Sequence, residues 1–439
     1  MERLKQRSFF ISSIVVVALL FVGAITYALL RDDDPYKYFT GMGNEFDISP
    51  DDQQFLFSYF VDGKEGIYRA NVDGTNVLQL TSSETKRHHA PKYANDGTKI
   101  LFLSQNSEGV NSLVVADQDG NQQKQITPNN VHVSEAVFST TGETVYYIGV
   151  SAETVNKTGE DIVEGLYSVN SNGENRKQLT TKVTSFMNSL AVTPDGNGIY
   201  YRLYDGQKER IFLFSFEKYE EKEAALSEVL PKDSYHYQFS PHEEQLAYTS
   251  ISEESRDKPH YEYELFLIDV KERQPKRLTN LQSSVVSPRF LHHKKQIAFL
   301  ENTSWPIQPF EHELYVLDLV TDALQSVEFA IPTQMSRLWF IKSVNQLVNG
   351  YTIAVLYIVL MGLLTTYLHQ YYGKRESYVP AIASLILSAI VIISSILVTV
   401  MVDPWYGIGF GMLAAALLGC TLLVLGYAFI LNFVSKKLA

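Results

Sequence analysis

The sequence predicts an all-β, six-bladed propeller joined to one N-terminal and three C-terminal membrane helices. Three observations lead to this fold class. A unit of roughly 45 residues, the size of one propeller blade, recurs six times between residues 44 and 330. Apolar runs between its turn motifs alternate in the manner of half-buried strands. Four long apolar runs near the two ends are each long enough to cross a bilayer.

The first repeat, residues 49–81, shows the unit most completely. It opens with the turn Ser49-Pro50-Asp51-Asp52 and continues into the strand Phe55-Leu56-Phe57. A second strand passes through Ile67-Tyr68, and the unit closes with Asp73-Gly74 and Leu80-Thr81. Pro fixes the first position of a turn and Gly accepts positive φ, so these dipeptides punctuate four short strands.

Five further units keep parts of this pattern. Their first turns and strands are marked by Asn95-Asp96-Gly97, Thr141-Gly142, Pro194-Asp195-Gly196, Ser240-Pro241 and Ser287-Pro288. The fourth unit lacks the second Asp-Gly turn, and the sixth lacks the closing Leu-Thr. A single four-stranded sheet cannot bury both of its faces, so the units are expected to stack face to face in a ring.

The repeat Pro-x-aromatic-Ser-Pro-Asp-Gly, Asp-x-Asp-Gly, Leu-Thr resembles that of the TolB-type propeller. The resemblance covers roughly residues 40–330 and is strongest in the first three units. It implies a six-bladed extracytoplasmic propeller of a family that usually binds proteins. The C-terminal membrane bundle is not part of that family's pattern.

Apolar runs divide the rest of the chain. The expected spans are Phe9–Leu30, Val348–Leu368, Val379–Val402 and Gly407–Phe433. A cleaved signal peptide ending near Thr26-Tyr27-Ala28 is the alternative to the first anchor. The predicted parts are a cytoplasmic N-terminus, an anchor, a linker, the propeller, an interfacial linker, a three-helix bundle and a cytoplasmic tail: residues 1–8, 9–30, 31–43, 44–330, 331–347, 348–433 and 434–439.

Basic residues set the predicted topology, because Lys and Arg concentrate on the cytoplasmic side. They precede the first span, occupy the loop between the second and third spans, and end the chain: Arg3, Lys5, Arg7, Lys374, Arg375, Lys436 and Lys437. Both termini are then cytoplasmic and the propeller is extracytoplasmic. We expect a multi-pass protein of a cell membrane, and the lack of cysteine outside the spans fits a bacterial envelope.

Composition and missing motifs argue against several functions. The net charge of -12 argues against nucleic-acid binding, which needs clustered Lys and Arg. None of the four spans contains Asp, Glu, Lys or Arg, which disfavours an ion transporter. The sequence has no G-x-S-x-G elbow, P-loop or H-E-x-x-H motif.

A ring of polar residues is expected at the mouth of the central channel, where each first strand begins. Alignment on the turn glycines gives the candidate ligand-binding set Asn44, Glu45, His89, Glu135, Asn188, Tyr235 and His236. No cofactor is predicted. The residue types Glu45, His89, Glu135 and His236 suit a divalent cation at this mouth, and the alternative is ordinary solvated side chains around a wet channel.

Two further sets are candidate partner contacts. Trp305 and Phe310 lie in a long apolar loop that either folds onto its own blade or anchors a partner. Gly407, Gly411, Ala415 and Gly419 form a small-xxx-small stripe that either packs within the bundle or docks a partner helix.

These expectations favour a non-catalytic scaffold or sensor that binds an envelope protein or a wall ligand near the membrane. One alternative is an accessory subunit of a transport or signalling complex. Another is a propeller hydrolase or lyase that uses the channel mouth.

Overall fold

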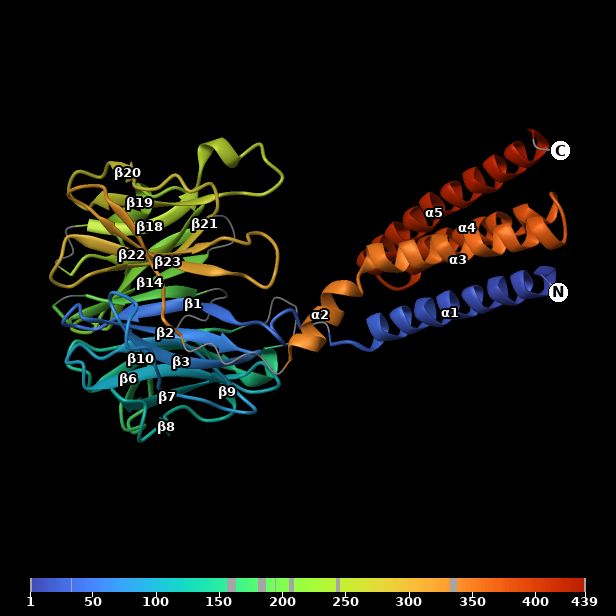
Figure 1. Ribbon diagram of the computed structural model, residues 1–439. Helices are drawn as coiled ribbons and strands as arrows, with labels where there is room; N and C mark the ends of the chain where they lie inside the picture. The colour runs from blue at the N-terminus through green and yellow to red at the C-terminus, as the bar shows by residue number, and fades with distance from the viewer. Residues whose placement is uncertain are drawn as a thin grey trace. The chain divides into compact units, whose positions relative to one another are not determined.

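The computed structural model describes residues 2–32, 34–155, 163–180, 187–193, 195–204, 209–241, 245–331 and 338–437. The chain separates into two compact units. Met1–Asp33 and Arg337–Ala439 form the helical unit, and Asp34–Ser336 form the β unit (Figure 1).

The β unit has a propeller-like fold built from consecutive groups of four antiparallel strands (Figure 1). Three groups are separate four-stranded sheets: β5(Arg87–Tyr93), β6(Lys99–Gln105), β7(Asn111–Asp117) and β8(Lys124–Gln125); β9(Val131–Phe138), β10(Thr144–Ser151), β11(Gly165–Asn170) and β12(Lys177–Gln178); β13(Met187–Val192), β14(Gly198–Tyr204), β15(Glu209–Ser215) and β16(Glu220–Glu223).

The other strands belong to one twelve-stranded sheet that contains three more groups of four. These are β1(Gly41–Ile48), β2(Gln54–Val61), β3(Lys64–Asn71) and β4(Leu78–Gln79); β17(Ser234–Phe239), β18(Gln245–Ile251), β19(Tyr263–Asp269) and β20(Pro275–Arg277); β21(Ser284–Phe290), β22(Gln296–Asn302), β23(His312–Asp318) and β24(Leu324–Val327). A single bridge at Met42–His312 links the β1 and β21 groups, and another at Tyr263–Ser284 links the β17 and β21 groups.

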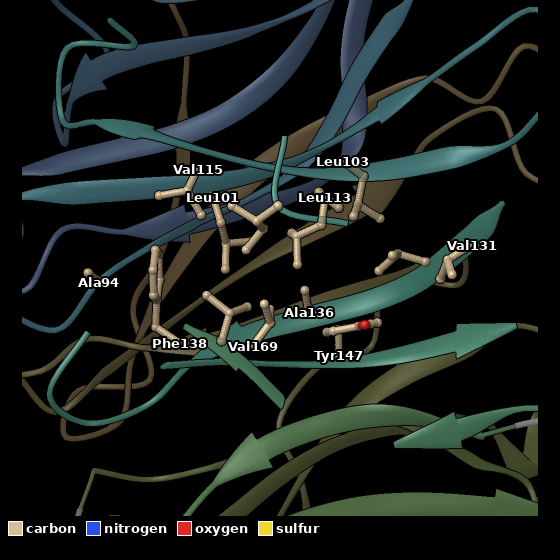
Figure 2. Close-up of a cluster of buried hydrophobic side chains, with 14 residues drawn as sticks. Ala94, Leu101, Leu103, Leu113, Val115, Val131, Ala136, Phe138, Tyr147 and Val169 are labelled. Carbon is tan, nitrogen blue, oxygen red and sulfur yellow. The ribbon is translucent and has the colours of Figure 1, made fainter. Parts of the chain in front are cut away.

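Apolar side chains fill the space between consecutive groups. Figure 2 shows the cluster between the β5 and β9 groups, where Leu101, Leu103 and Leu113 face Phe138 and Tyr147. Equivalent clusters lie between the other neighbours: Leu56 with Ile100, Leu166 with Tyr201, Ile211 with Tyr248, and Leu265 with Phe299. The alternation of the strands thus buries both faces of each group against its neighbours.

The first and last groups in the sequence also share a core. Phe46, Phe57 and Tyr68 of the β1 group pack with Leu300 and Leu314 of the β21 group. The segment after β24 adds to this seam, because Phe329 stacks on Phe57 with ring centroids 4.2 Å apart. A cavity of about 290 Å³ lies beside the same segment, lined by residues that include Met42, His312 and Phe329.

The closing Leu-Thr of the repeat has a structural role. The Thr hydroxyl accepts the backbone N–H of a residue in the third strand, fourteen positions earlier, at 2.8–3.1 Å. Ser227 does the same for Ile211 in the β13 group, where the sequence has no Leu-Thr. The hydroxyl therefore fixes the chain beside the third strand, and the pairs are Thr81 with Ile67, Thr127 with Leu113, Thr180 with Leu166, and Thr279 with Leu265.

The helical unit contains α1(Glu2–Leu30), α2(Trp339–Leu347), α3(Gly350–Tyr371), α4(Val379–Met401) and α5(Pro404–Lys437). Of the described helices, α1, α3, α4 and α5 are long and apolar enough to cross a membrane, as the sequence predicts. The α5 helix is longer than its predicted span, and α2 occupies part of the predicted interfacial linker.

Hydroxyl groups join three of these helices. Tyr357 of α3 donates to Ser384 of α4 at 2.6 Å, and Ser384 lies 2.6 Å from the hydroxyl of Thr421 on α5. All three side chains are buried. Hydrogen bonds between helices stabilise membrane bundles because lipid offers no competing partner.

Candidate functional site: the inner strands

The first strand of every four-stranded group has an irregular register near its beginning. Single residues near the irregularity have positive φ in four groups, with φ of 52–59° at Ala90, Ser189, His236 and Ser287. A β-bulge of this kind turns a side chain away from the regular alternation. These register shifts lie at or beside the positions of the predicted polar ring. They are at Met42/Phe46, His89/Lys92, Glu135/Val133, Asn188/Ala191, Tyr235/Gln238 and Val286/Arg289.

Charged side chains from different groups meet along these strands. Glu45 Oε2 of β1 lies 3.8 Å from Lys92 Nζ of β5. Asp47, two residues beyond Glu45, lies 3.8 Å from Nε of Arg289 on β21. Arg289 also donates to Gln238 Oε1 of β17 at 2.8 Å.

We name Glu45, Asp47, Lys92, Glu135, Gln238 and Arg289 the inner-strand cluster. The sequence prediction found Glu45 and Glu135 but missed the other four. Strand alternation was the available signal for Asp47 and Gln238, because they follow the predicted ring residues Glu45 and His236 by two positions. It gave no signal for Lys92, which is three positions beyond His89, or for Arg289, whose group has no predicted ring residue.

Burial and mutual charge shape the electrostatics of the cluster. The side chains of Lys92 and Arg289 are 12% and 18% exposed. Burial lowers the pKa of the Lys92 ammonium and Arg289 lowers it further, while Glu45, Asp47 and Glu135 raise it. Burial likewise raises the pKa of the Glu135 carboxyl, and Glu45 adds to this effect.

The two cations have unused hydrogen-bonding capacity. In the part of the chain that the structure describes, Lys92 Nζ and Arg289 Nε are shielded from solvent without a hydrogen-bond acceptor. Their carboxylate neighbours stay at 3.8 Å, which is longer than a charge-assisted hydrogen bond. Each of these two atoms could therefore donate one further hydrogen bond to an acceptor such as a carboxylate or a hydroxyl oxygen.

Glu135 also joins two neighbouring groups. Its carboxylate accepts the backbone N–H of Ser189 at 2.6 Å and that of Leu190 at 3.0 Å, both from β13. Asp47 similarly accepts the N–H of Tyr93 on β5 at 2.8 Å. Both acids therefore serve the packing of adjacent groups as well as the charge of the cluster.

The other predicted ring residues make separate contacts. His89 Nε2 lies 3.2 Å from Asn111 Oδ1, and His236 Nδ1 lies 3.0 Å from the Thr249 hydroxyl. The carbonyl of Asn44 accepts a hydrogen bond from Ser287, the amide of Asn188 accepts one from Ser189, and Tyr235 lies under the guanidinium of Arg202 at 4.9 Å. Among the described residues no group of three or more His, Cys, Asp or Glu side chains is arranged to hold a metal ion.

The long loop between β22 and β23 folds against its neighbours. The indole N–H of Trp305 donates to the Tyr261 carbonyl at 2.8 Å, and the ring meets Tyr263 edge-on. The backbone N–H of Phe310 donates to the Tyr36 hydroxyl at 3.1 Å. The loop tip stays open to solvent, because Ile307 is 72% exposed.

The residues of the small-residue stripe lie on two different faces of α5. A Cβ on Gly407 would collide with Thr399 of α4, and one on Gly411 would touch Ser395 at 3.3 Å. Ala415 is exposed, and a Cβ on Gly419 would meet nothing within 4 Å. The described residues of α5 that are buried are Gly407, Ala414, Cys420, Thr421, Val424 and Ala428.

Comparisons with known proteins agree with the repeat pattern. A family model described as the dipeptidyl peptidase IV N-terminal region, a propeller-type domain, matches residues 85–209. No curated protein sequence matches this chain. The solved structures that resemble it include TolB-type propeller proteins.

Three of the similar solved structures belong to proteins of different kinds. TolB from Acinetobacter baumannii is 15% identical with a TM-score of 0.44, and the match covers 67% of this chain and 64% of that one. Oligogalacturonate lyase from Vibrio parahaemolyticus is 12% identical with a TM-score of 0.44, covering 63% and 90%. A puromycin-hydrolysing peptidase of Mycobacterium tuberculosis is 10% identical with a TM-score of 0.45, covering 69% and 56%.

Proposed function

We propose that this protein is a membrane-anchored propeller that holds a protein or wall ligand of the cell envelope without catalysing a reaction. The inner-strand cluster carries the proposal. Buried Lys92 and Arg289 offer hydrogen-bond donors that the described residues leave unused. Buried polar groups of this kind are normally satisfied, so their arrangement favours a ligand with acceptor groups.

A closed ring of six blades would support this role. The apolar cluster between the β1 and β21 groups joins the two ends of the series, as the other clusters join consecutive groups. Ring closure would bring the first strands of all six groups around one axis, where a rigid disc presents a fixed set of side chains.

The decisive experiment compares affinity co-purification from gently solubilised native membranes for matched variants of the full chain. Glu45→Gln/Lys92→Gln removes two of the charges of the cluster, one of each sign, while it retains polar side chains. Lys64→Gln/Glu84→Gln removes an ion pair between β3 and the segment that joins β4 to β5, and serves as the control. The side chains of this pair are 56% and 82% exposed. We expect a stoichiometric partner with wild type and control, and its loss with the cluster variant.

A co-purified partner that both variants retain would exclude the cluster as the contact. A preparation without any protein partner would direct attention to small-molecule ligands and to the lyase or hydrolase alternative. Measured melting temperatures of both variants would show whether the cluster variant is folded.

The proposed topology places the propeller outside the cytoplasm and both termini inside it. Labelling with a membrane-impermeant maleimide tests this in a Cys420→Ala background. Val320→Cys, at a position 72% exposed in the β unit, should react in intact cells. Glu376→Cys, beside the basic loop, should react only after the membrane is permeabilised, and the reverse result would overturn the topology.

A second candidate function is that of an accessory subunit whose α5 docks a partner helix. It is favoured by the exposed Ala415 and Gly419, where a neighbouring backbone can approach closely. Ala415→Leu/Gly419→Leu should then abolish co-purification without changing the bundle. Gly407→Leu is expected to disrupt the bundle itself, because Gly407 faces Thr399.

A further inference from the structure

We propose that the tip of the β22–β23 loop, together with Tyr261, inserts into the lipid headgroup layer of the membrane that anchors the chain. We name Tyr261, Trp305, Ile307 and Phe310 the loop-tip patch. This inference goes beyond the proposed ligand binding and depends only on the membrane spans.

The loop-tip patch is apolar where it faces outward. Ile307 is 72% exposed and Tyr261 is 48% exposed. The only indole donor of the patch is satisfied internally, because Trp305 Nε1 bonds to the Tyr261 carbonyl. The indole can therefore enter a less polar layer without losing a hydrogen bond.

The chain itself keeps the patch near the bilayer. The Tyr36 hydroxyl accepts the N–H of Phe310, and the Tyr36 ring stacks on Phe60 at 5.3 Å. Five residues separate Tyr36 from Leu30, where α1 ends. The six Cα-to-Cα steps between them reach at most about 20 Å when fully extended, so the covalent chain keeps Tyr36 within about that distance of the end of α1.

The residue types of the loop-tip patch favour insertion among lipid headgroups over electrostatic attraction to an anionic membrane surface. Trp and Tyr are enriched at the headgroup level because their rings are apolar with one polar edge. Both acidic and basic residues are neighbours of this region in the sequence, and Lys37, Glu311 and His260 among them are exposed. Zwitterionic lipid should thus suffice, and added salt should have little effect on the contact.

A fluorescent label on the full chain in phosphatidylcholine nanodiscs tests the proposal. Single cysteines replace Ile307 or Val320 in a Cys420→Ala background, and each receives an environment-sensitive NBD group. Both positions are 72% exposed, but Ile307 precedes β23 and Val320 follows it, at opposite ends of that strand. We expect a blue-shifted emission at position 307 that spin-labelled lipid quenches, and a water-like, unquenched emission at 320.

Three results would overturn the proposal. The first is a water-like emission at both positions in a chain whose spans are embedded in the bilayer. Co-elution of the chain with the nanodisc establishes separately that the spans are embedded. The second is a blue shift at 307 that spin-labelled lipid does not quench, which would indicate a protein contact. The third is unchanged quenching of Trp305 by brominated lipid, in a Trp339→Phe/Trp405→Phe background, after Ile307→Asp.

Discussion

The aromatic ring of Phe329 stacks on that of Phe57 with centroids 4.2 Å apart and planes 23° apart. Phe329 follows the last strand of the β unit, whereas Phe57 lies in β2, so this contact joins the two ends of the repeat series. Phe329 also meets Phe55 edge-on at 6.3 Å. The segment that leaves the last group therefore packs into the seam that the first group forms with it.

Phe329→Ala should weaken this seam. Full truncation of a buried Phe costs about 3–5 kcal/mol, and the half-buried Phe329 should cost about 2 kcal/mol. Thermal unfolding of the full chain in micelles measures the change. Val320→Ala, at an exposed site of the same group, is the control and should leave the melting temperature unchanged. Equal melting temperatures for both variants would show that the seam does not depend on Phe329.

Thr127→Val should destabilise the β5 group. The Thr127 hydroxyl is buried and accepts the N–H of Leu113 at 2.9 Å, and valine has the same shape without an acceptor. An unsatisfied buried N–H costs about 1–3 kcal/mol. Thr127→Ser retains the hydroxyl and should unfold close to wild type. Unchanged stability of Thr127→Val would show that the hydroxyl does not hold this segment in place.

His88 should make the stability of the protein depend on pH. Its side chain is buried, and Nδ1 lies 2.9 Å from the Thr81 hydroxyl, which already accepts the Ile67 N–H. Burial lowers the pKa of His88 to about 4, with smaller effects from Lys86 and His89. Between pH 6.5 and 4 the unfolded chain binds a proton that the folded chain rejects, so stability is greatest above pH 6.5 and falls toward pH 4.

The size of this effect follows from proton linkage. Each pH unit in that interval should remove up to about 1.4 kcal/mol through His88, and the loss should level off below pH 4. His88→Asn keeps an acceptor near Thr81 but does not titrate. Chemical unfolding of both proteins at pH 7, 6 and 5 should give a smaller slope for the variant. Parallel slopes would mean that His88 has the same pKa in the folded and the unfolded protein, contrary to the effect of its burial.

The repeat pattern predicted much of this architecture because turn glycines fix strand register. Aligning the turns placed Glu45, His89 and His236 at equivalent positions of the first strands, and the structure has a register shift at or beside each of these positions. The ion partners Lys92 and Arg289 were missed because pairing between groups depends on twist and stacking, which the sequence of one repeat does not encode. Phe329 was missed because the repeat marks end before it.

The stripe on α5 shows a different limit. Steps of four residues rotate about 40° beyond one full turn of an α-helix, so a 407-411-415-419 series turns away from a fixed neighbour. Gly407 and Gly411 face α4, while Ala415 and Gly419 lie on an exposed face. Burial continues instead through Ala414, Thr421 and Ala428, a spacing of seven residues that keeps one face toward its neighbour.

The hydroxyl network of the helical unit supplies a last prediction. Ser384 has no exposed surface and shares its hydroxyl with Tyr357 and Thr421, so Ser384→Ala should loosen the contact among three helices. Interhelical hydrogen bonds in membranes contribute about 0.6–2 kcal/mol. The double-mutant cycle of Ser384→Ala with Tyr357→Phe isolates their shared bond, since each change removes one partner of it. A coupling energy in this range, measured by unfolding in mixed micelles, would show that the bond stabilises the bundle. Strict additivity would show that Tyr357 and Ser384 act through packing alone, and the bundle would then owe its stability to the close fit of small residues on α4 and α5.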